Sequence, residues 1–325
     1  MTRKAGWPAW PGLTRRAGRA SRSLGPRAAF PGQALAGARG DRRPRLTVCQ
    51  GEAMDYAMTP TTQEAVAQSR ANFIDRLPYP VELHLEWLAR DGRPYRLEAG
   101  GETAGHCIVA ADGMLVEFHL DDRFVPDAQA IFDVVAARAG IKQVWLHSFD
   151  GLCLRCCLDK GLTATVAGYC FRDFLPTPAG GAGGLVRRAA GPGDYDGLLA
   201  HTDALYESEE QLRHMLANGM LHLYHEAGRL VGCGYLIRVR PDRDWRDLGM
   251  WVPSSLRRRG YARRILADLK DWCLREGWRP CCGCAADNVA SRRALEANGF
   301  VSRHAVLSFA LCPPGRRGNG VSRQL

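Results

Sequence analysis

The sequence predicts an α/β protein made of two similar halves, each with a mixed central sheet flanked by helices. Apolar residues alternate over some short stretches and recur at helical spacing over others, in regular succession. A stretch of Pro, Gly, Ala and Thr at residues 176–184 separates the two halves. The residues from Asp150 to Leu162 resemble those from Asn288 to Phe300 at a constant offset of 138, which indicates an internal duplication.

The second half alternates between the two kinds of pattern. Apolar or alternating stretches predict strands at 185–190, 221–225, 230–239, 247–252, 279–285 and 304–311. Helical spacing predicts helices at 195–205, from Ser208 to 217, from Ala262 onward and at 289–298. Ser208 and Gln211 form a capping-box signature, and Gly299 suits a left-handed helix end. We expect the last strand to form a hairpin and complete this half.

The first half repeats much of this order. Its patterns predict strands at 96–99, 106–110, 114–120 and 143–149 and helices at 128–139 and after Asp150. The expected organisation is therefore a first domain at 54–175, a linker at 176–184, a second domain at 185–312 and a disordered tail at 313–325.

The basic charge of the chain is concentrated in its leader. Residues 1–50 hold ten Arg and one Lys against one Asp, so they carry the whole net charge of +10 and the remainder is neutral. The part of the chain after the leader therefore shows no overall electrostatic bias toward nucleic acid. We expect residues 1–53 to be a disordered tail, or an extension upstream of a true start at Met54 or Met58. Arg richness also fits a transit peptide, although the Pro and Gly content disfavours one.

The twelve cysteines fit a reducing, cytoplasmic location. Two groups, Cys153-Leu-Arg-Cys156-Cys157 and Cys281-Cys282-Gly-Cys284, have metal-like spacing but no His at zinc-ligand spacing. Cysteine is among the most buried residue types, so we expect these residues to fill the core and predict no metal site. No apolar run is long enough to span a membrane, so we expect no membrane partner.

An anion-binding loop is the sharpest functional signal in the chain. The strand expected at 247–252 is followed by a short link and then by a loop that opens an amphipathic helix, Arg257, Arg258, Arg259, Gly260, Tyr261 and Ala262. Free backbone N–H groups and the positive end of the helix dipole converge at such a helix start, which favours a phosphate. Gly260 and Ala262 allow the close approach of an anion.

These residues resemble the GNAT superfamily of acyl-CoA-dependent N-acetyltransferases. Arg257, Gly260 and Ala262 meet its Arg/Gln-x-x-Gly-x-Gly/Ala loop, and Asn288 with Gly299-Phe300 meets a second signature. The gap of 28 residues between Gly260 and Asn288 also fits. The resemblance covers about 185–311 and implies tandem GNAT-like domains, the first of them degenerate.

The resemblance implies a site for acetyl-CoA as the acyl donor. The loop amides from Arg258 to Ala262 would hold the pyrophosphate of acetyl-CoA. Asn288 would contact the cofactor side of the site, cap its own helix, or do both. Backbone groups of Met250, Trp251 and Val252 would pair with the pantetheine arm, and one N–H there would polarise the thioester carbonyl. The first half has His119-Leu-Asp121-Asp122-Arg123-Phe124 at the loop position, with no Gly and two carboxylates. We therefore expect it to act without cofactor, as a scaffold or as a wall of the acceptor site.

Acetyl transfer to an amine needs a base, because an alkylammonium with a pKa of about 10 is not nucleophilic at neutral pH. Asp247 is the candidate catalytic base, and its alternative role is an ion pair with Arg243 or Arg246. Asp244, Glu207, Glu209, Glu210 and His201 are weaker candidates for the base or for binding a cationic acceptor. In many GNAT proteins a Tyr acts as the acid, and at its position this chain has Leu295.

The expected function is transfer of an acetyl group to a primary amine of a small molecule or peptide by direct attack. The opposing hypothesis is a non-catalytic acyl-CoA-binding pseudoenzyme or regulatory protein, which Leu295 favours. A nucleic-acid binder that depends on the leader is a third reading. The sequence gives no indication of the oligomeric state or of the particular acceptor.

Overall fold

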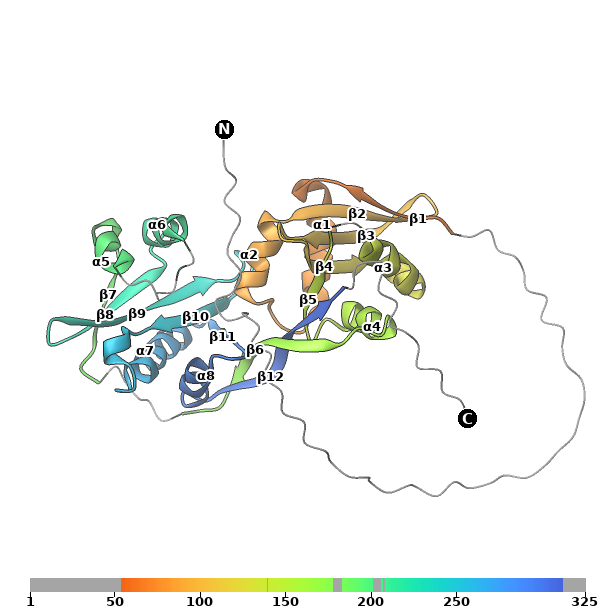
Figure 1. Cartoon of the computed structure of the whole chain (residues 1–325). Helices are drawn as coiled ribbons and strands as arrows, with labels where there is room; N and C mark the ends of the chain where they lie inside the picture. The colour runs from red at the N-terminus through yellow and green to blue at the C-terminus, as the bar shows by residue number, and fades with distance from the viewer. Residues whose placement is uncertain (1–53, 139, 178–182, 201–205, 207, 312–325) are drawn as a thin grey trace, which may run out of the picture.

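The computed structural model describes residues 54–311 apart from 139, 178–182, 201–205 and 207. The expected leader at 1–53, the tail at 313–325, most of the linker, His201 and Glu207 lie outside the described residues. Two lobes of strands and helices lie side by side, and apart from their final strands they correspond to the two halves of the sequence (Figure 1).

The first half begins with a strand and two helices, continues with three strands and a helix, and ends in a strand, a helix and a strand. In order these are β1 (Tyr56–Pro60), α1 (Gln63–Arg76), α2 (Leu83–Asp91), β2 (Arg93–Ala99), β3 (Glu102–Val109), β4 (Met114–Leu120), the 3-10 helix η1 (Asp122–Asp127), α3 (Ala128–Ala137), β5 (Gln143–His147), α4 (Gly151–Asp159) and β6 (Ala164–Phe174).

The second half repeats that order, with one added 3-10 turn after its first strand. Its elements are β7 (Val186–Ala189), the 3-10 helix η2 (Pro192–Asp194), α5 (Tyr195–Leu199), α6 (Glu209–Ala217), β8 (Leu221–Glu226), β9 (Arg229–Arg238), β10 (Trp245–Trp251), the 3-10 helix η3 (Ser254–Leu256), α7 (Tyr261–Arg275), β11 (Arg279–Ala285), α8 (Val289–Glu296) and β12 (Phe300–Ala310). The predicted duplication is thus visible in the order of the elements.

Local capping explains several of these boundaries. The side chain of Asp150 accepts from the amide of Cys153, and that of Asn288 accepts from the amide of Ser291, so equivalent residues cap α4 and α8. Ser208 caps α6 by accepting from the amide of Gln211. Gly299 has φ 80°, the left-handed conformation predicted for it.

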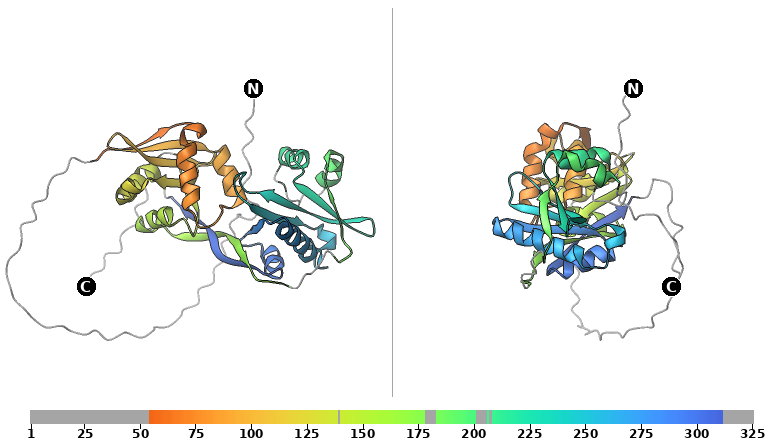
Figure 2. Two further views of the ribbon diagram at one scale, coloured as in Figure 1. Left: turned by 180° about the vertical axis from the view of Figure 1, so that it is seen from behind. Right: turned by 90° about the vertical axis from the view of Figure 1, so that its left-hand side faces the viewer.

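The strands form one sheet in the order β1-β2-β3-β4-β5-β12-β6-β11-β10-β9-β8-β7. The pairs β4–β5 and β10–β11 are parallel, and the other neighbouring strands are antiparallel. Helices α1, α2, α5 and α6 lie on one face, whereas α3, α4, α7 and α8 lie on the other (Figures 1 and 2). The predicted α/β class with mixed sheets flanked by helices is confirmed, and the two sheets join edge to edge.

The last strand was expected to complete its own half, and that expectation is wrong. β12 pairs with β5 of the first half on one side and with β6, also of the first half, on the other. β6 in turn pairs with β11 of the second half. The two halves therefore exchange their final strands, a choice of partner that the alternation of residues along a strand does not specify.

The cores follow this arrangement. One apolar cluster fills the first half beneath α3 and α4, and another lies between the second half of the sheet and α7 and α8. A third cluster joins the halves: Leu83 of α2 packs with Leu212 of α6 and with Trp251 of β10. Ten cysteines in the described chain are free and buried, as expected for core-filling residues.

Candidate active site

A gap between two parallel strands forms the centre of the candidate site. β10 pairs with β11 from Trp245 to Asp247, opposite Arg279 to Cys281, while the pairing of β10 with β9 continues to Trp251. Beyond Asp247, no strand of the described chain pairs with the edge of β10 that faces β11. Leu248 and Val252 are buried against the α7 side, whereas Trp251 is buried in the cluster that contains Leu83.

The loop that follows β10 gathers unpaired backbone donors. Arg258 has φ 63° and Gly260 has φ 83°, so two left-handed residues bend the chain into the start of α7. Among the described residues, no acceptor is hydrogen-bonded to the backbone N–H groups of Arg258 to Ala262. These donors lie at the positive end of the α7 dipole, where an anion such as a phosphate is favoured.

Other groups hold this loop in place. The guanidinium Nε of Arg257 donates to the carbonyl of Val252 at 3.1 Å, which ties the loop to the end of its strand. Glu226 at the end of β8 accepts from the hydroxyl of Tyr261 at 2.6 Å and from Arg264 at 2.9 Å. Tyr261 thus anchors the first turn of α7, whereas the side chains of Arg258 and Arg259 are exposed.

Asp247 is buried at the point where β10 and β11 separate. Its Oδ2 accepts a hydrogen bond of 3.2 Å from the hydroxyl of Tyr235 on β9. The alternative ion pairs are absent from the described chain, because Arg243 bonds Asp75 and the Arg246 guanidinium bonds the carbonyls of Arg243 and Trp245. Burial, reinforced by the charge of Glu82, raises the pKa of Asp247 to about 8. A carboxyl with a pKa in this range is suited to taking a proton near neutral pH.

The ring of Tyr235 lies across a glycine on the neighbouring strand. A Cβ built at Gly249 would lie 2.1 Å from Cε1 of Tyr235, so any larger residue would displace the ring. Burial and the nearby Asp247 charge raise the pKa of Tyr235 well above its ordinary value. The hydroxyl therefore keeps its proton and can donate it to the Asp247 carboxylate in a hydrogen bond.

The first half contributes two charged groups to the same place. Glu82 is the N-cap of α2, and its carboxylate acts on the charge of Asp247. Arg172 of β6 is buried and donates to the carbonyls of Pro80 and Cys282, at 3.1 Å and 2.8 Å. Its charge lowers the pKa of Asp247 in opposition to burial, and its Nη2 has no hydrogen-bond partner in the described chain.

Other residues that the sequence predicted for the site lie on other elements, apart from Asp247. Asn288 caps α8, and Leu295, at the position of the usual acid, is 2 % exposed in the apolar cluster under α7. Glu209 is exposed and bonded to Tyr195 and Arg213, and Glu210 is exposed. The structure places Asp247, Met250 and Trp251 on β10 and Val252 directly after it, and η3 connects this strand to the loop at the start of α7.

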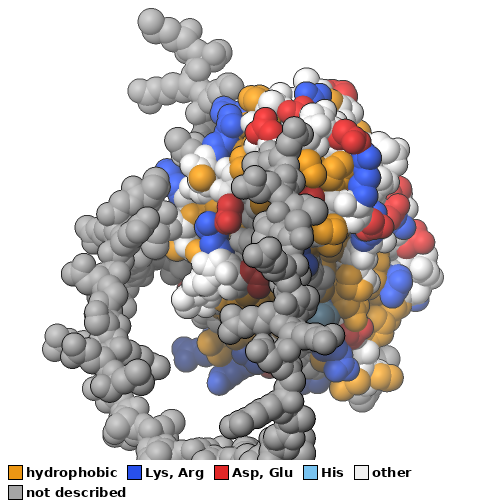
Figure 3. Space-filling view, turned by 90° about the vertical axis from the view of Figure 1, so that its right-hand side faces the viewer, with side chains coloured by type: hydrophobic (Ala, Val, Ile, Leu, Met, Phe, Trp, Pro, Cys, Tyr) orange, Lys and Arg blue, Asp and Glu red, His pale blue; other side chains and the backbone are white. Residues whose placement is uncertain are grey.

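Among the described residues of the first half, no comparable loop follows β4. The residues after β4 form η1, with Arg76 paired to Asp122 at 3.0 Å and Arg123 paired to Glu102 at 2.6 Å. Beyond the parallel pairing of β4 and β5, Glu117 is buried and ion-paired with Arg70 at 2.8 Å. Charged side chains of both signs are interspersed with hydrophobic ones on the end of this half (Figure 3).

Sequence reasoning missed Tyr235, Glu82 and Arg172. Tyr235 could be found only by knowing which residue of β9 faces Gly249 and Asp247, a register that the pattern alone does not fix. Glu82 lies far from Asp247 along the chain, and its one local signal is a helix start after Pro80. Within the described residues there is no cluster of three metal-binding side chains and no helix long and apolar enough to cross a membrane.

Comparison with known families identifies both halves. Residues 62–174 match one acetyltransferase (GNAT) domain model, and residues 192–301 match another. Together the two matches cover more than half of the chain. The protein therefore belongs to the GNAT acetyltransferase superfamily and contains two GNAT domains in tandem.

Solved structures share this fold. An acetyltransferase of the GNAT family from Colwellia psychrerythraea matches at TM-score 0.70 and 19 % identity, over 79 % of this chain and 100 % of its own. A GCN5-related N-acetyltransferase from Sphaerobacter thermophilus matches at TM-score 0.52 and 16 % identity, over 79 % and 96 %. A tandem GNAT protein from the clavulanic acid biosynthesis pathway matches at TM-score 0.50 and 13 % identity, over 80 % and 100 %. No curated protein sequence matches significantly.

Proposed function

We propose that this protein is an acetyl-CoA-dependent N-acetyltransferase whose second half binds acetyl-CoA and acetylates a primary amine of a small molecule or peptide. The unpaired amides of Arg258 to Ala262 at the start of α7 carry this proposal, because only the short η3 turn separates them from β10, the strand whose edge is open. Backbone donors at a helix start suit the pyrophosphate of a coenzyme A thioester. The open edge at Met250, Trp251 and Val252 suits its amide-bearing arm.

Residues of this chain would divide the work of transfer. When bound, acetyl-CoA supplies an acetyl thioester, whose carbonyl carbon forms a bond to the amine nitrogen as its bond to sulfur breaks. Asp247 takes the proton that the ammonium must lose, and the Tyr235 hydroxyl keeps the carboxylate oriented. A backbone N–H on the open edge of β10 polarises the carbonyl. Leu295 offers no hydroxyl, so the departing thiolate takes its proton from solvent.

The test is release of free thiol from acetyl-CoA by the full chain over a panel of amines. Thiol release that requires an amine would support the proposal, and acetyl-CoA that fails to bind would refute the cofactor site. The second candidate is a non-catalytic acyl-CoA-binding protein, favoured by the burial of Leu295 at the usual acid position. Tight binding of acetyl-CoA without turnover on any amine would select this candidate.

A cytoplasmic location is part of the proposal. We place the protein in the cytoplasm, because the ten described cysteines are free and a reducing compartment keeps thiols in that state.

A further inference from the structure

The first half has its own gap between two parallel strands. β4 and β5 pair only at Met114 and Leu115, opposite Gln143 and Val144, just as β10 and β11 pair only up to Asp247. The residues that follow this pairing on both strands border a cavity, in which the space open to the centre of a water molecule is about 10 Å³. Its lining residues are Phe73, Val81, Leu85, Glu86, Val116, Glu117, Leu146, His147 and Asp150.

This cavity has room for about one water molecule. A buried water needs about 10–15 Å³ of such space and two to four polar partners. The lining residues are buried apart from Glu86, which is partly exposed. Four of them carry ionisable side chains, namely Glu86, Glu117, His147 and Asp150. The size of the cavity and the chemistry of its lining therefore both fit a water molecule.

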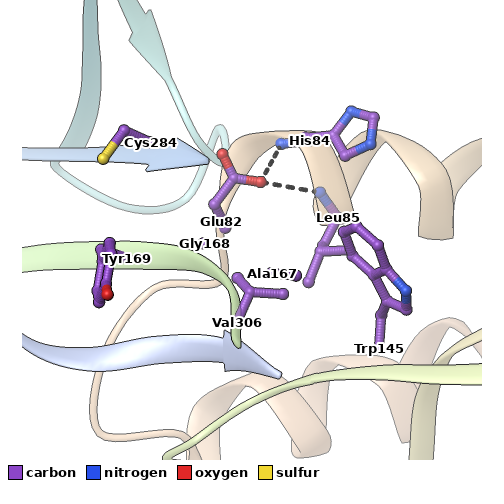
Figure 4. A pocket seen from close by; sticks show the side chains of 9 residues that line it. All are labelled: Glu82, His84, Leu85, Trp145, Ala167, Gly168, Tyr169, Cys284 and Val306. Carbon is purple, nitrogen blue, oxygen red and sulfur yellow. Dashed lines mark hydrogen bonds between the residues drawn. The ribbon is translucent and has the colours of Figure 1, made fainter. Parts of the chain in front are cut away.

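The ring of His147 has an unused donor. Oε2 of Glu82 accepts from the amides of His84 and Leu85, which fixes Glu82 at the start of α2 (Figure 4). The amide of Glu82 in turn donates to Nε2 of His147 at 2.8 Å, so this nitrogen carries a lone pair. Burial lowers the pKa of His147 to about 3, which keeps the ring neutral. The ring proton is therefore on Nδ1, and no acceptor in the described chain is hydrogen-bonded to it.

Two carboxyl groups have unused acceptors. Asp150 is 7 % exposed, and its Oδ1 accepts from the amide of Cys153 at 3.3 Å. Oε2 of Glu86 accepts from Arg70 at 2.8 Å. In the described chain, no donor is hydrogen-bonded to the second oxygen of either group. Glu117 differs from these two, because Arg70 donates to both of its oxygens.

The combination of one donor and two acceptors selects the occupant. A water molecule accepts a hydrogen bond from the Nδ1–H group of His147 and donates its two protons to carboxyl oxygens. A metal ion or an ammonium group would meet the same Nδ1–H group with no lone pair to accept from it. Arg70 already supplies a positive charge here, because its Nη2 lies 2.8 Å from both Glu86 and Glu117.

We propose that the gap of the first half is a binding site for one structural water, which bridges His147 to Asp150 and Glu86. The water joins the end of β5 to the N-cap of α4 and to α2, the helix that Glu82 caps. It satisfies buried polar groups that would otherwise destabilise the fold. The first half thus uses for its own stability the kind of gap that in the second half is proposed to take the cofactor arm.

The test is magnetic relaxation dispersion of water in solutions of the full chain, which measures the number of slowly exchanging buried waters. Val116→Ile adds one methyl group to the lining and should remove one water from that number. Its melting temperature should fall by several degrees, because buried polar groups lose their partner. Asp150→Asn keeps an acceptor oxygen and should retain the water. Val135→Ile is the matched control, a fully buried core residue outside the cavity lining, and should also retain it.

The sign of the stability change discriminates between a bound water and a dry cavity. A methyl group that fills a dry cavity stabilises the fold, so a higher melting temperature of Val116→Ile with an unchanged number of waters would overturn the proposal. If that variant does not fold, a high-resolution crystal structure of the unaltered chain decides. Density for one water within hydrogen-bond distance of Nδ1 of His147 and Oδ2 of Asp150 would support the site, and its absence would overturn it. Two coenzyme A molecules bound per chain would also contradict it, because a second cofactor arm would need this space.

Discussion

The hydroxyl of Tyr235 donates to the carboxylate of Asp247 across two neighbouring strands, over a glycine that leaves room for the ring. The hydroxyl of Tyr235 keeps its proton, whereas the carboxyl of Asp247 gains and loses a proton near neutral pH. Asp247 is thereby held at the end of the parallel pairing of β10 and β11, where the proposed mechanism has an acceptor amine lose its proton.

The first prediction concerns the pH dependence of catalysis. Because the pKa of Asp247 is raised to about 8, its carboxyl is protonated below that pH, and kcat/KM should rise as pH increases through about 8. Asp247→Asn should lower kcat about 10²- to 10⁴-fold and remove this dependence. Tyr235→Phe removes a hydrogen bond to the charged form and should move the rise to higher pH. Asp244 is exposed, so Asp244→Asn serves as the control and should leave the pH profile unchanged. A wild-type kcat/KM that is constant from pH 6 to 9 would contradict the role of Asp247 as the base.

The second prediction separates loop geometry from cofactor binding. Gly260 and Gly228 have φ 83° and 76°, and neither has an atom within 4 Å of an added Cβ. Substitution by Ala should therefore strain both positions, at a cost of about 1–3 kcal/mol in stability. Only Gly260→Ala should also weaken acetyl-CoA binding, because only its backbone belongs to the amide-rich loop. Calorimetric titration of both variants with acetyl-CoA measures this, and equal affinities would argue against the loop as the phosphate site.

The third prediction distinguishes the two roles of Asn288. Asn and Asp are comparable N-caps, so Asn288→Asp should preserve the bond to the Ser291 amide and leave the melting temperature nearly unchanged. If the residue also faces the bound thioester, the added negative charge should raise the KM for acetyl-CoA several-fold. Asn288→Ala should cost about 1 kcal/mol of stability through loss of the cap. Unchanged acetyl-CoA kinetics in a stable Asn288→Asp protein would reduce Asn288 to a cap alone.

The fourth prediction concerns the equivalent residue of the first half. Burial, with a contribution from the Glu117 charge, raises the pKa of Asp150 to about 7. The folded protein therefore binds this proton more tightly than the unfolded chain, so the carboxyl costs stability as pH rises from about 4 to about 7. Asp150→Asn keeps an acceptor for the Cys153 amide and should raise the melting temperature at pH 8 but hardly at pH 4. The exposed Asp55→Asn should show no such difference, and a uniform change at both pH values would count against the raised pKa.

Local features of the fold could be predicted from the sequence. β11 has the predicted bounds, and Ser208 and Gly299 have their predicted roles, because caps and helix ends depend on a few adjacent residues. The order of the duplicated elements followed from the same kind of pattern.

Long-range relationships could not be predicted in this way. Alternation along β12 indicates which side chains are buried, but its pairing with β5 and β6 depends on the closure of the whole sheet. Glu82 approaches Asp247 only because the two halves share that sheet and α2 lies over their seam. Sequence reasoning within the second half finds the carboxylate of Asp247, but it misses that of Glu82, which comes from the first half.

The exchange of final strands also bears on how the chain is made. A ribosome delivers β5 long before β12, so the edge of β5 that β12 covers must wait for almost all of the second half. During that interval the nascent first half presents unpaired backbone groups, the kind of edge that promotes aggregation. The first half is thus synthesised first, but its sheet is completed last. A chain truncated before β12 would leave the edge of β5 exposed.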